Sequence, residues 1–188
     1  MMEEEIILAV DFLKKGRIIL YPTDTIWGIG CDATQPKPVE RIYKIKKRME
    51  IKSMIVLLDH ASKLTGYVDK VPPIAYDLIE RYNDPLTIIY PRAKNLARNV
   101  IAEDGTIAIR IVRDEFCRRM VEMLGRPVVS TSANVSGEPA PLMFSKIHEE
   151  ITGAVDYIIN YNRQNIVRTK PSTIIRILEN NEFEVIRK

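Results

Sequence analysis

Residues 16–31 read GRIILYPTDTIWGIGC, and the rest of the chain is organised around this stretch. Four consecutive apolar residues, 18–21, stand between an arginine that follows glycine and a proline, which predicts a short buried strand. A polar turn of sequence PTDT follows, and after it come an aromatic residue and two glycines. Loops of this kind at strand ends place ligand-binding groups at the edge of a rigid sheet. The stretch therefore predicts either a ligand-binding loop or a simple turn into a second, glycine-containing strand.

The composition is that of an ordinary globular protein. The chain has 188 residues, of which 46% are hydrophobic and 28% charged, enough for one well-packed core and few for two. Its 28 basic and 25 acidic residues give a net charge of +3, too small by itself to imply nucleic-acid binding. We therefore expect residues 1–188 to form a single domain.

Three features favour a cytoplasmic protein that does not enter a membrane. The chain begins MMEEE, whereas a secretory signal begins with basic residues. No apolar run reaches the roughly 18 residues that a membrane-spanning helix needs. Cys31 and Cys117 are isolated, as are His60 and His148, so neither a disulfide framework nor a metal site is expected.

Helical and strand patterns alternate along the chain. Helices are expected at residues 3–15, from 38 to the basic run at 44–48, in two pieces within 60–82, from 114 to 124 and near 145–151. Strands are expected at 18–21, 54–58, 86–90, 106–112, 127–130, 156–160, 172–178 and 183–187, the last two as a hairpin. This alternation predicts one α/β domain with a mixed sheet.

Common nucleotide and hydrolase motifs are missing or incomplete. Gly28, Gly30 and Ala33 fit the dinucleotide pattern G-x-G-x-x-G/A, but that pattern should open a helix directly, and the residues TQP intervene. The sequence has no G-x-x-x-x-G-K-[ST] phosphate loop and no G-x-S-x-G elbow. These absences argue against a Rossmann site, a Walker-type site and a serine hydrolase.

A basic run at the end of the second predicted helix offers a different anion site. Lys46 and Arg48, both expected to be exposed, could project toward one phosphate group if the helix ends there. The PTDT and STSAN segments would supply hydroxyl and amide donors. Taken alone, the basic run more often marks a solvated helix face, and Ser132 and Asn134 could simply cap a helix.

Four motifs occur in a fixed order: PTDTIWGIG, IKKR, TIAIR and STSANVSG. Together, at these separations, they resemble the YrdC-like domain of threonylcarbamoyl-adenylate synthases, and the resemblance covers about residues 16–187. It implies a twisted mixed sheet flanked by helices, with a concave basic face that binds the ligands. Larger members of this family carry a further C-terminal domain, which we do not expect in this chain.

The resemblance also assigns site residues. The family's ATP-binding tetrad of K-x-R and S-x-N falls on Lys46, Arg48, Ser132 and Asn134, with Thr106 and Arg187 also near the nucleotide. Lys46 and Arg48 would act as the catalytic pair that steadies the phosphate charge. Threonine would be bound by Thr25, Arg110, Ser130 and Ser172.

The implied reaction joins L-threonine and bicarbonate into a carbamate, which attacks the α-phosphorus of ATP. Threonylcarbamoyl-AMP and pyrophosphate are formed, and other proteins use the first to modify adenosine 37 of certain tRNAs. Mg²⁺ would be held mainly by phosphate oxygens and water, with no metal site of the protein's own.

Arg110 can be interpreted in two ways from its position. It lies within the predicted strand 106–112, and the isoleucines on either side of it point to the opposite, core-facing side. A cation that is even partly buried in an apolar strand needs an anionic partner. That partner is either the carboxylate of the substrate or an internal acid such as Asp24 or Asp32.

Two other functions remain open from the sequence. One is a module that binds double-stranded RNA or tRNA through its basic surface without chemistry, which would need neither the S-x-N pair nor Arg110. The other is carbamoyl transfer, known among relatives in hydrogenase maturation, which would retain the ATP residues and lose the threonine pocket.

Overall fold

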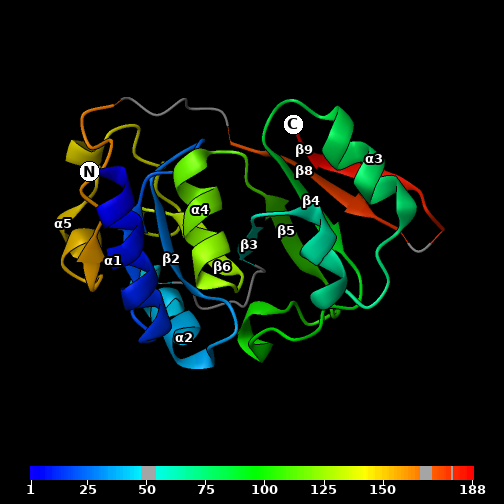
Figure 1. Ribbon diagram of the computed structural model, residues 1–188, viewed down its shortest axis with the longest axis horizontal. Coiled ribbons are helices and arrows are strands. Elements are labelled where there is room, and N and C mark those ends of the chain that lie inside the picture. The colour runs from blue at the N-terminus through cyan, green and yellow to red at the C-terminus, as the bar shows by residue number, and fades with distance from the viewer. Residues whose placement is uncertain (48–53, 166–170, 179) are drawn as a thin grey trace.

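The computed structural model describes residues 1–47, 54–165, 171–178 and 180–188 (Figure 1). Its α-helices are α1 (Met2–Lys14), α2 (Pro36–Ile45), α3 (Pro73–Arg81), α4 (Glu115–Leu124) and α5 (Glu149–Thr152), and three short 3₁₀ segments are η1 (Ala61–Gly66), η2 (Arg98–Val100) and η3 (Phe144–Lys146). The strands are β1 (Ile19–Tyr21), β2 (Gly28–Asp32), β3 (Ile55–Leu58), β4 (Leu86–Tyr90), β5 (Ile107–Ile111), β6 (Val128–Ser132), β7 (Tyr157–Ile158), β8 (Thr173–Ile177) and β9 (Phe183–Arg187).

All nine of these strands form one sheet, in the order β7-β1-β2-β6-β3-β5-β4-β8-β9. The pairs β1/β7, β3/β5 and β4/β8 are parallel, whereas the others are antiparallel. The prediction of an α/β fold with a mixed sheet and a C-terminal hairpin is therefore confirmed.

The stretch at residues 16–31 forms the end of α1 and the antiparallel pair β1/β2, in which Tyr21 lies opposite Gly28. Gly16, just past the helix, has φ +69°, a conformation that glycine adopts without steric cost. A side chain at Gly30 would meet the Val129 carbonyl oxygen at 2.6 Å and the Tyr21 ring at 2.7 Å. The glycine is required because this ring lies across the β2 backbone.

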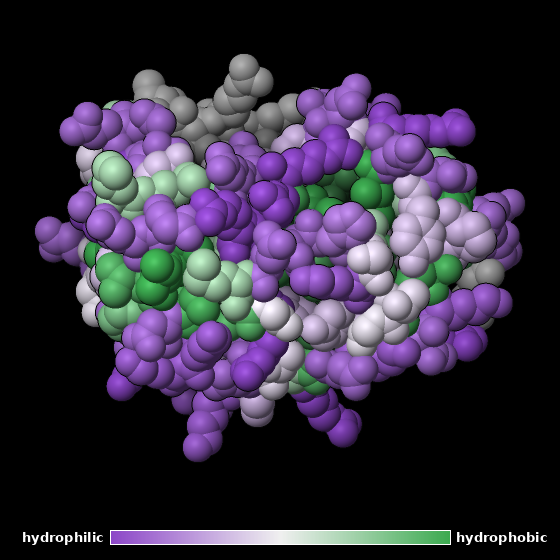
Figure 2. All heavy atoms as spheres, viewed as in Figure 1, coloured by the Kyte–Doolittle hydropathy of each residue, from purple (hydrophilic) through white to green (hydrophobic). Residues whose placement is uncertain are grey.

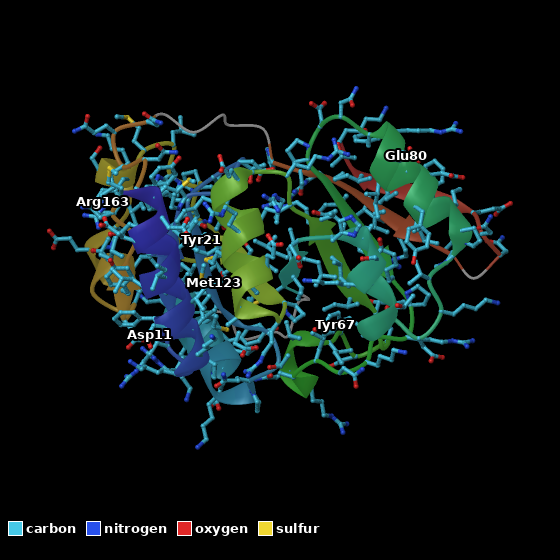
Figure 3. All side chains as sticks on the ribbon, in the orientation of Figure 1. Asp11, Tyr21, Tyr67, Glu80, Met123 and Arg163 are labelled. Atoms are coloured by element: carbon cyan, nitrogen blue, oxygen red, sulfur yellow. The ribbon has the colours of Figure 1, made fainter. Side chains whose placement is uncertain are left out.

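Helices cover the two faces of the sheet unequally. On one face, α1 and α4 lie next to each other and pack with the fully buried Tyr21, Leu57 and Val128 (Figures 1 and 3). On the other, α2, α3 and η1 pack against alternate residues of the same strands, such as Val56 and Val129. The α1/α4 pair reaches only part of its face, and the uncovered part is where a cavity forms.

Some expected boundaries were wrong. Helix α2 begins at Pro36 rather than at 38, because a proline at the first helical position gives up no hydrogen bond. Strand β6 continues to Ser132, beyond the expected end at 130, because it stays paired with β2. The predicted helix near 145–151 is divided into η3 and α5, since the His148 ring accepts the amide of Glu150 and starts a new helix. Within the described ranges, no helix has the length and apolar character to cross a membrane.

Candidate functional site

A cavity of about 750 Å³ opens on the uncovered part of the sheet. Its walls come from the loop before β2, the end of α2, and strands β3, β5, β6, β8 and β9. Of the ten site residues expected from the sequence, eight line it: Thr25, Lys46, Arg110, Ser130, Ser132, Asn134, Ser172 and Arg187. Segments more than a hundred residues apart in the chain thus contribute to one cavity.

Two expected residues are not among its lining. Arg48 lies outside the residues that the structure describes. Thr106, just before β5, donates its hydroxyl to Asp104 Oδ1 at 2.6 Å and does not line the cavity. The same contact with Thr106 holds the pKa of Asp104 below its ordinary value. Thr106 therefore stabilises the turn that precedes β5 in this structure.

The sheet register brings the polar side chains together. Ser130 of β6 lies opposite Ile55 of β3, and Arg110 of β5 lies opposite Leu57, two residues further along the same strand. Since residues two apart on a strand share a face, Ser130 and Arg110 project toward the same side of the sheet. Thr87 of β4 lies opposite Arg110 and shares a hydrogen bond of 2.8 Å with Ser172.

Lys46 lies at the C-terminal cap of α2 and is only 3% exposed. Its Nζ donates to the side-chain oxygens of Ser132 at 3.2 Å and Asn134 at 3.0 Å, and to the backbone carbonyl oxygens of both residues. The expectation that Lys46 is exposed, and with it the interpretation as a solvated helix face, is wrong at this residue. The reason is that the fourth motif, STSANVSG, folds over the helix end and surrounds the ammonium group with oxygen atoms.

Arg110 is buried, at 4% exposure, and lines the same cavity. Its Nη1 donates to Thr25 Oγ1 at 3.3 Å, and its Nη2 lies 3.3 Å from Asp24 Oδ1. Its Nε has no hydrogen-bond partner among the described residues. The internal pair with Asp24 that the sequence left open is therefore present, and Arg110 nevertheless lines the cavity.

Arg187, on β9, adds a second guanidinium group to this part of the cavity. Its Nε and Nη2 donate to the carbonyl oxygen of Ser172 at 3.2 and 2.8 Å. Burial, together with the nearby positive charge of Arg110, lowers the pKa of Arg187. Two guanidinium groups that repel each other in one cavity favour an anionic ligand.

Sequence reasoning did not single out Thr23 or Lys47, which also line the cavity. The Thr23 hydroxyl donates to the Ile26 carbonyl at 2.6 Å and accepts the amides of Thr25 and Ile26, so it fixes the turn that presents Thr25. Lys47 is exposed and pairs with Glu150 at 2.6 Å. Both residues lie inside quoted motifs, which was the available signal.

Sulfur and metal ligands play no part in the described site. Cys31 and Cys117 are buried free thiols. In the part of the chain that the structure covers, no group of three His, Cys, Asp or Glu side chains could hold a metal ion. The site thus offers hydroxyl groups, amides and cations, a set suited to carboxylate and phosphate groups.

Comparison with known proteins gives one family. The model of the Sua5/YciO/YrdC family, described as telomere recombination, matches residues 11–188. Threonylcarbamoyl-AMP synthase of Pseudoalteromonas translucida strain TAC 125 is 33% identical over 175 residues, 92% of each chain. The Pyrococcus abyssi enzyme of the same name is 28% identical over 94% of this chain and 52% of its own length, so the chain spans about half of that relative.

Solved structures agree with the sequence matches. The chain is similar to Pyrococcus abyssi Sua5 complexed with L-threonine, with a TM-score of 0.86 and 26% identity over 100% of this chain and 54% of the other. It is also similar to Escherichia coli YciO, with a TM-score of 0.85 and 25% identity over 100% of this chain and 90% of the other. The family match over nearly the whole chain, the shared fold and the gathered motifs together show that the chain belongs to the Sua5/YciO/YrdC family.

Proposed function

We propose that this chain is a threonylcarbamoyl-AMP synthase, a nucleotidyltransferase that uses L-threonine, bicarbonate and ATP. The observation that carries the proposal is the single cavity that collects eight residues of the ATP and threonine sets. The names of relatives such as the Pseudoalteromonas translucida enzyme support it.

Threonine would bind where Arg110 faces the cavity. The Arg110 Nε–H is buried and has no partner among the residues that the structure describes, and a substrate carboxylate can accept it. Thr25, Ser130 and Ser172 supply hydroxyl groups around this position. The amino group of threonine then reacts with bicarbonate, forming a carbamate and releasing water.

ATP would bind in the same cavity, beside Lys46, Ser132 and Asn134. A carbamate oxygen attacks the α-phosphorus, the bond to the β-phosphate oxygen breaks, and pyrophosphate leaves. We propose that Arg48 and Arg187 also bind ATP. For Thr106 to bind ATP, its hydrogen bond to Asp104 would first have to break.

The chemistry asks for positioning and charge stabilisation rather than a strong base. Mg²⁺ would arrive with ATP and be held mainly by phosphate oxygens and water, since the described residues form no metal-binding group. The product would be passed to proteins that modify adenosine 37 of tRNA. The free, buried thiols are consistent with a reducing, cytoplasmic location.

Pyrophosphate release measured with threonine and bicarbonate each supplied or withheld tests the proposal. We expect release only when ATP, threonine and bicarbonate are all present. Release that needs bicarbonate and ammonia but not threonine would favour carbamoyl transfer, because a carbamoyl group requires a nitrogen donor. No release, combined with salt-dependent binding of tRNA or double-stranded RNA, would favour the RNA-binding module.

A further inference from the structure

Asp24 lies between two cavities. It belongs to the loop that joins β1 to β2 and lines a second cavity of about 250 Å³, together with the apolar side chains of Ile88, Ile109 and Ile111. Figure 2 shows apolar side chains recessed beside α3 on this part of the surface. The Arg110 side chain, 3.3 Å from Asp24, lines the first cavity instead. The pair therefore connects the back of the proposed threonine site to a separate hollow.

The contacts of Arg110 divide its guanidinium group into a held end and an open position. Nη1 donates to Thr25 and Nη2 faces Asp24, so the terminal nitrogens are fixed by the loop. Nε has no partner within the described chain. Asp24 Oδ1 likewise makes no hydrogen bond there, so Asp24 acts on Arg110 through charge and proximity.

A counter-charge at this place has a physical reason. Arg110 is 4% exposed, and a buried guanidinium loses much of its hydration free energy unless an anion compensates. Asp24, with its side chain 24% exposed, supplies that anion from the side away from the first cavity. Without the Asp24 carboxylate, the state in which the arginine side chain turns toward water and leaves the cavity wall would have the lower free energy.

We propose that Asp24 is a positioning residue, which holds Arg110 so that its Nε–H faces the carboxylate of the amino-acid substrate. The inference rests on the proposed function, because it takes threonine as that substrate. Asp24 does not contact the substrate, since it lies behind the guanidinium and lines the other cavity. The substrate and Asp24 use different nitrogen atoms, so both anions can be accommodated at once.

Asp24→Asn tests the inference, because it removes the charge and keeps the size of the side chain. We expect the KM for threonine to rise about tenfold, with the KM for ATP and kcat at saturating threonine within about twofold of wild type. L-Threonine titrations by calorimetry should show the same loss in affinity. Asp84→Asn is the matched control, since Asp84 is exposed and lines the same second cavity, whereas the contacts described for Arg110 are with Thr25 and Asp24.

A double-mutant cycle identifies the route of the effect. In the Arg110→Lys background, Asp24→Asn should change the threonine affinity by less than about twofold, because the group that Asp24 positions is gone. An unchanged threonine KM, a lower one, or equal losses for threonine and ATP would each overturn the inference. Should Asp24→Asn fail to fold, Asp24→Glu takes its place, and a displaced carboxylate must then also affect threonine selectively.

The wild-type protein separates this test from that of the proposed function. A wild type that does not bind threonine overturns both. A wild type that binds threonine, with Asp24→Asn unaltered, overturns the inference alone.

Discussion

Arg110 and Lys46 are the two buried cations of the cavity whose contacts are described, and the chain holds them in different ways. Arg110 projects from β5, one residue before its end, and its terminal nitrogens face Asp24 and Thr25 of the first motif. Lys46 ends α2, and its ammonium group is surrounded by oxygens of Ser132 and Asn134.

This difference distinguishes the direction of a side chain from the groups that surround it. The direction of Arg110 follows from strand alternation, which is set by local geometry. The surroundings of Lys46 exist only because a segment 86–88 residues later in the chain folds over the helix end, so that no local pattern contains them. We therefore expect substitutions at Arg110 to alter ligand selection, and those at Lys46 to alter stability as well.

Arg110→Lys should have the largest effect on ligand binding. It keeps the charge but loses the planar fork that matches a carboxylate. We expect the KM for threonine to rise by up to about a hundredfold and the KM for ATP far less, measured by pyrophosphate release. Arg113→Lys is the control, since Arg113 donates to the carbonyls of Ile79 and Asn83 and lines the second cavity. Loss of stability with an unaltered threonine KM would make Arg110 purely structural.

Lys46→Ala should weaken ATP binding by about ten- to a hundredfold and also destabilise the fold by roughly 1–3 kcal/mol. The second effect follows because the oxygens of Ser132 and Asn134 lose a buried donor. Nucleotide titration and urea unfolding measure the two. Lys44→Ala, in the exposed pair of Lys44 with Glu40 on the same helix, should stay within about 0.5 kcal/mol. Equal stability of both variants would contradict the description of Lys46 as a buried tie.

Asp156→Asn should lower the stability of the fold through its contact with α2, the helix that ends at Lys46. It should not change threonine binding at Arg110. Asp156 pairs with Arg41 of α2 at 2.7 Å and accepts the amide of Ile18 at 2.7 Å. We expect a loss of about 1–2 kcal/mol at pH 7, measured by urea unfolding, and no change in the threonine KM. A changed threonine KM would show that the contacts of Asp156 and the surroundings of Arg110 are energetically coupled.

The same variant has a defined pH dependence. Burial alone would raise the pKa of Asp156, but Arg41, the Ile18 amide and Arg17 outweigh it and hold the pKa below the ordinary 3.8. The contribution of Asp156 to stability is therefore complete above the unfolded-state pKa, and is lost as the pH falls through the lower native value. The difference between wild type and Asp156→Asn should be constant at neutral pH and shrink in strong acid.

The smallest expected effect is the reaction of the two cysteine thiols with an alkylating reagent. Burial, with Asp32 beside Cys31 and Asp114 beside Cys117, raises the pKa of both well above the ordinary 9.0. Cys117 lies under the loop of the first motif, where its Sγ donates to the Pro22 carbonyl, and Cys31 lies in β2. Neither should react with iodoacetamide at pH 8 within an hour in the native protein, as mass spectrometry would show, whereas both should react in urea. Selective reaction of Cys117 would reveal opening on the Arg110 side.

Most of the fold was accessible from the sequence because its signals are local. The helix predicted at 114–124 is an example: Asp114 accepts the amide of Cys117 at its start and Gly125 follows its end at φ +69°, and both residue types favour these positions. The prediction of one helix at 145–151 was wrong because the amide of Glu150 donates to the His148 ring instead of to a helical carbonyl. Hydrophobic periodicity contains no signal for such a contact.

The sequence by itself determined the strand alternation that directs Arg110, the motifs of the cavity, and the family resemblance that assigned their roles. The tertiary structure alone decided that Lys46 is buried and that Asp24 rather than Asp32 faces Arg110. Asp32 is instead taken by Thr34, Gln35 and Arg126. The physical reason is range: backbone geometry acts over a few residues, whereas the partner of a buried charge is whichever group the packed sheet and its loops bring within about 4 Å.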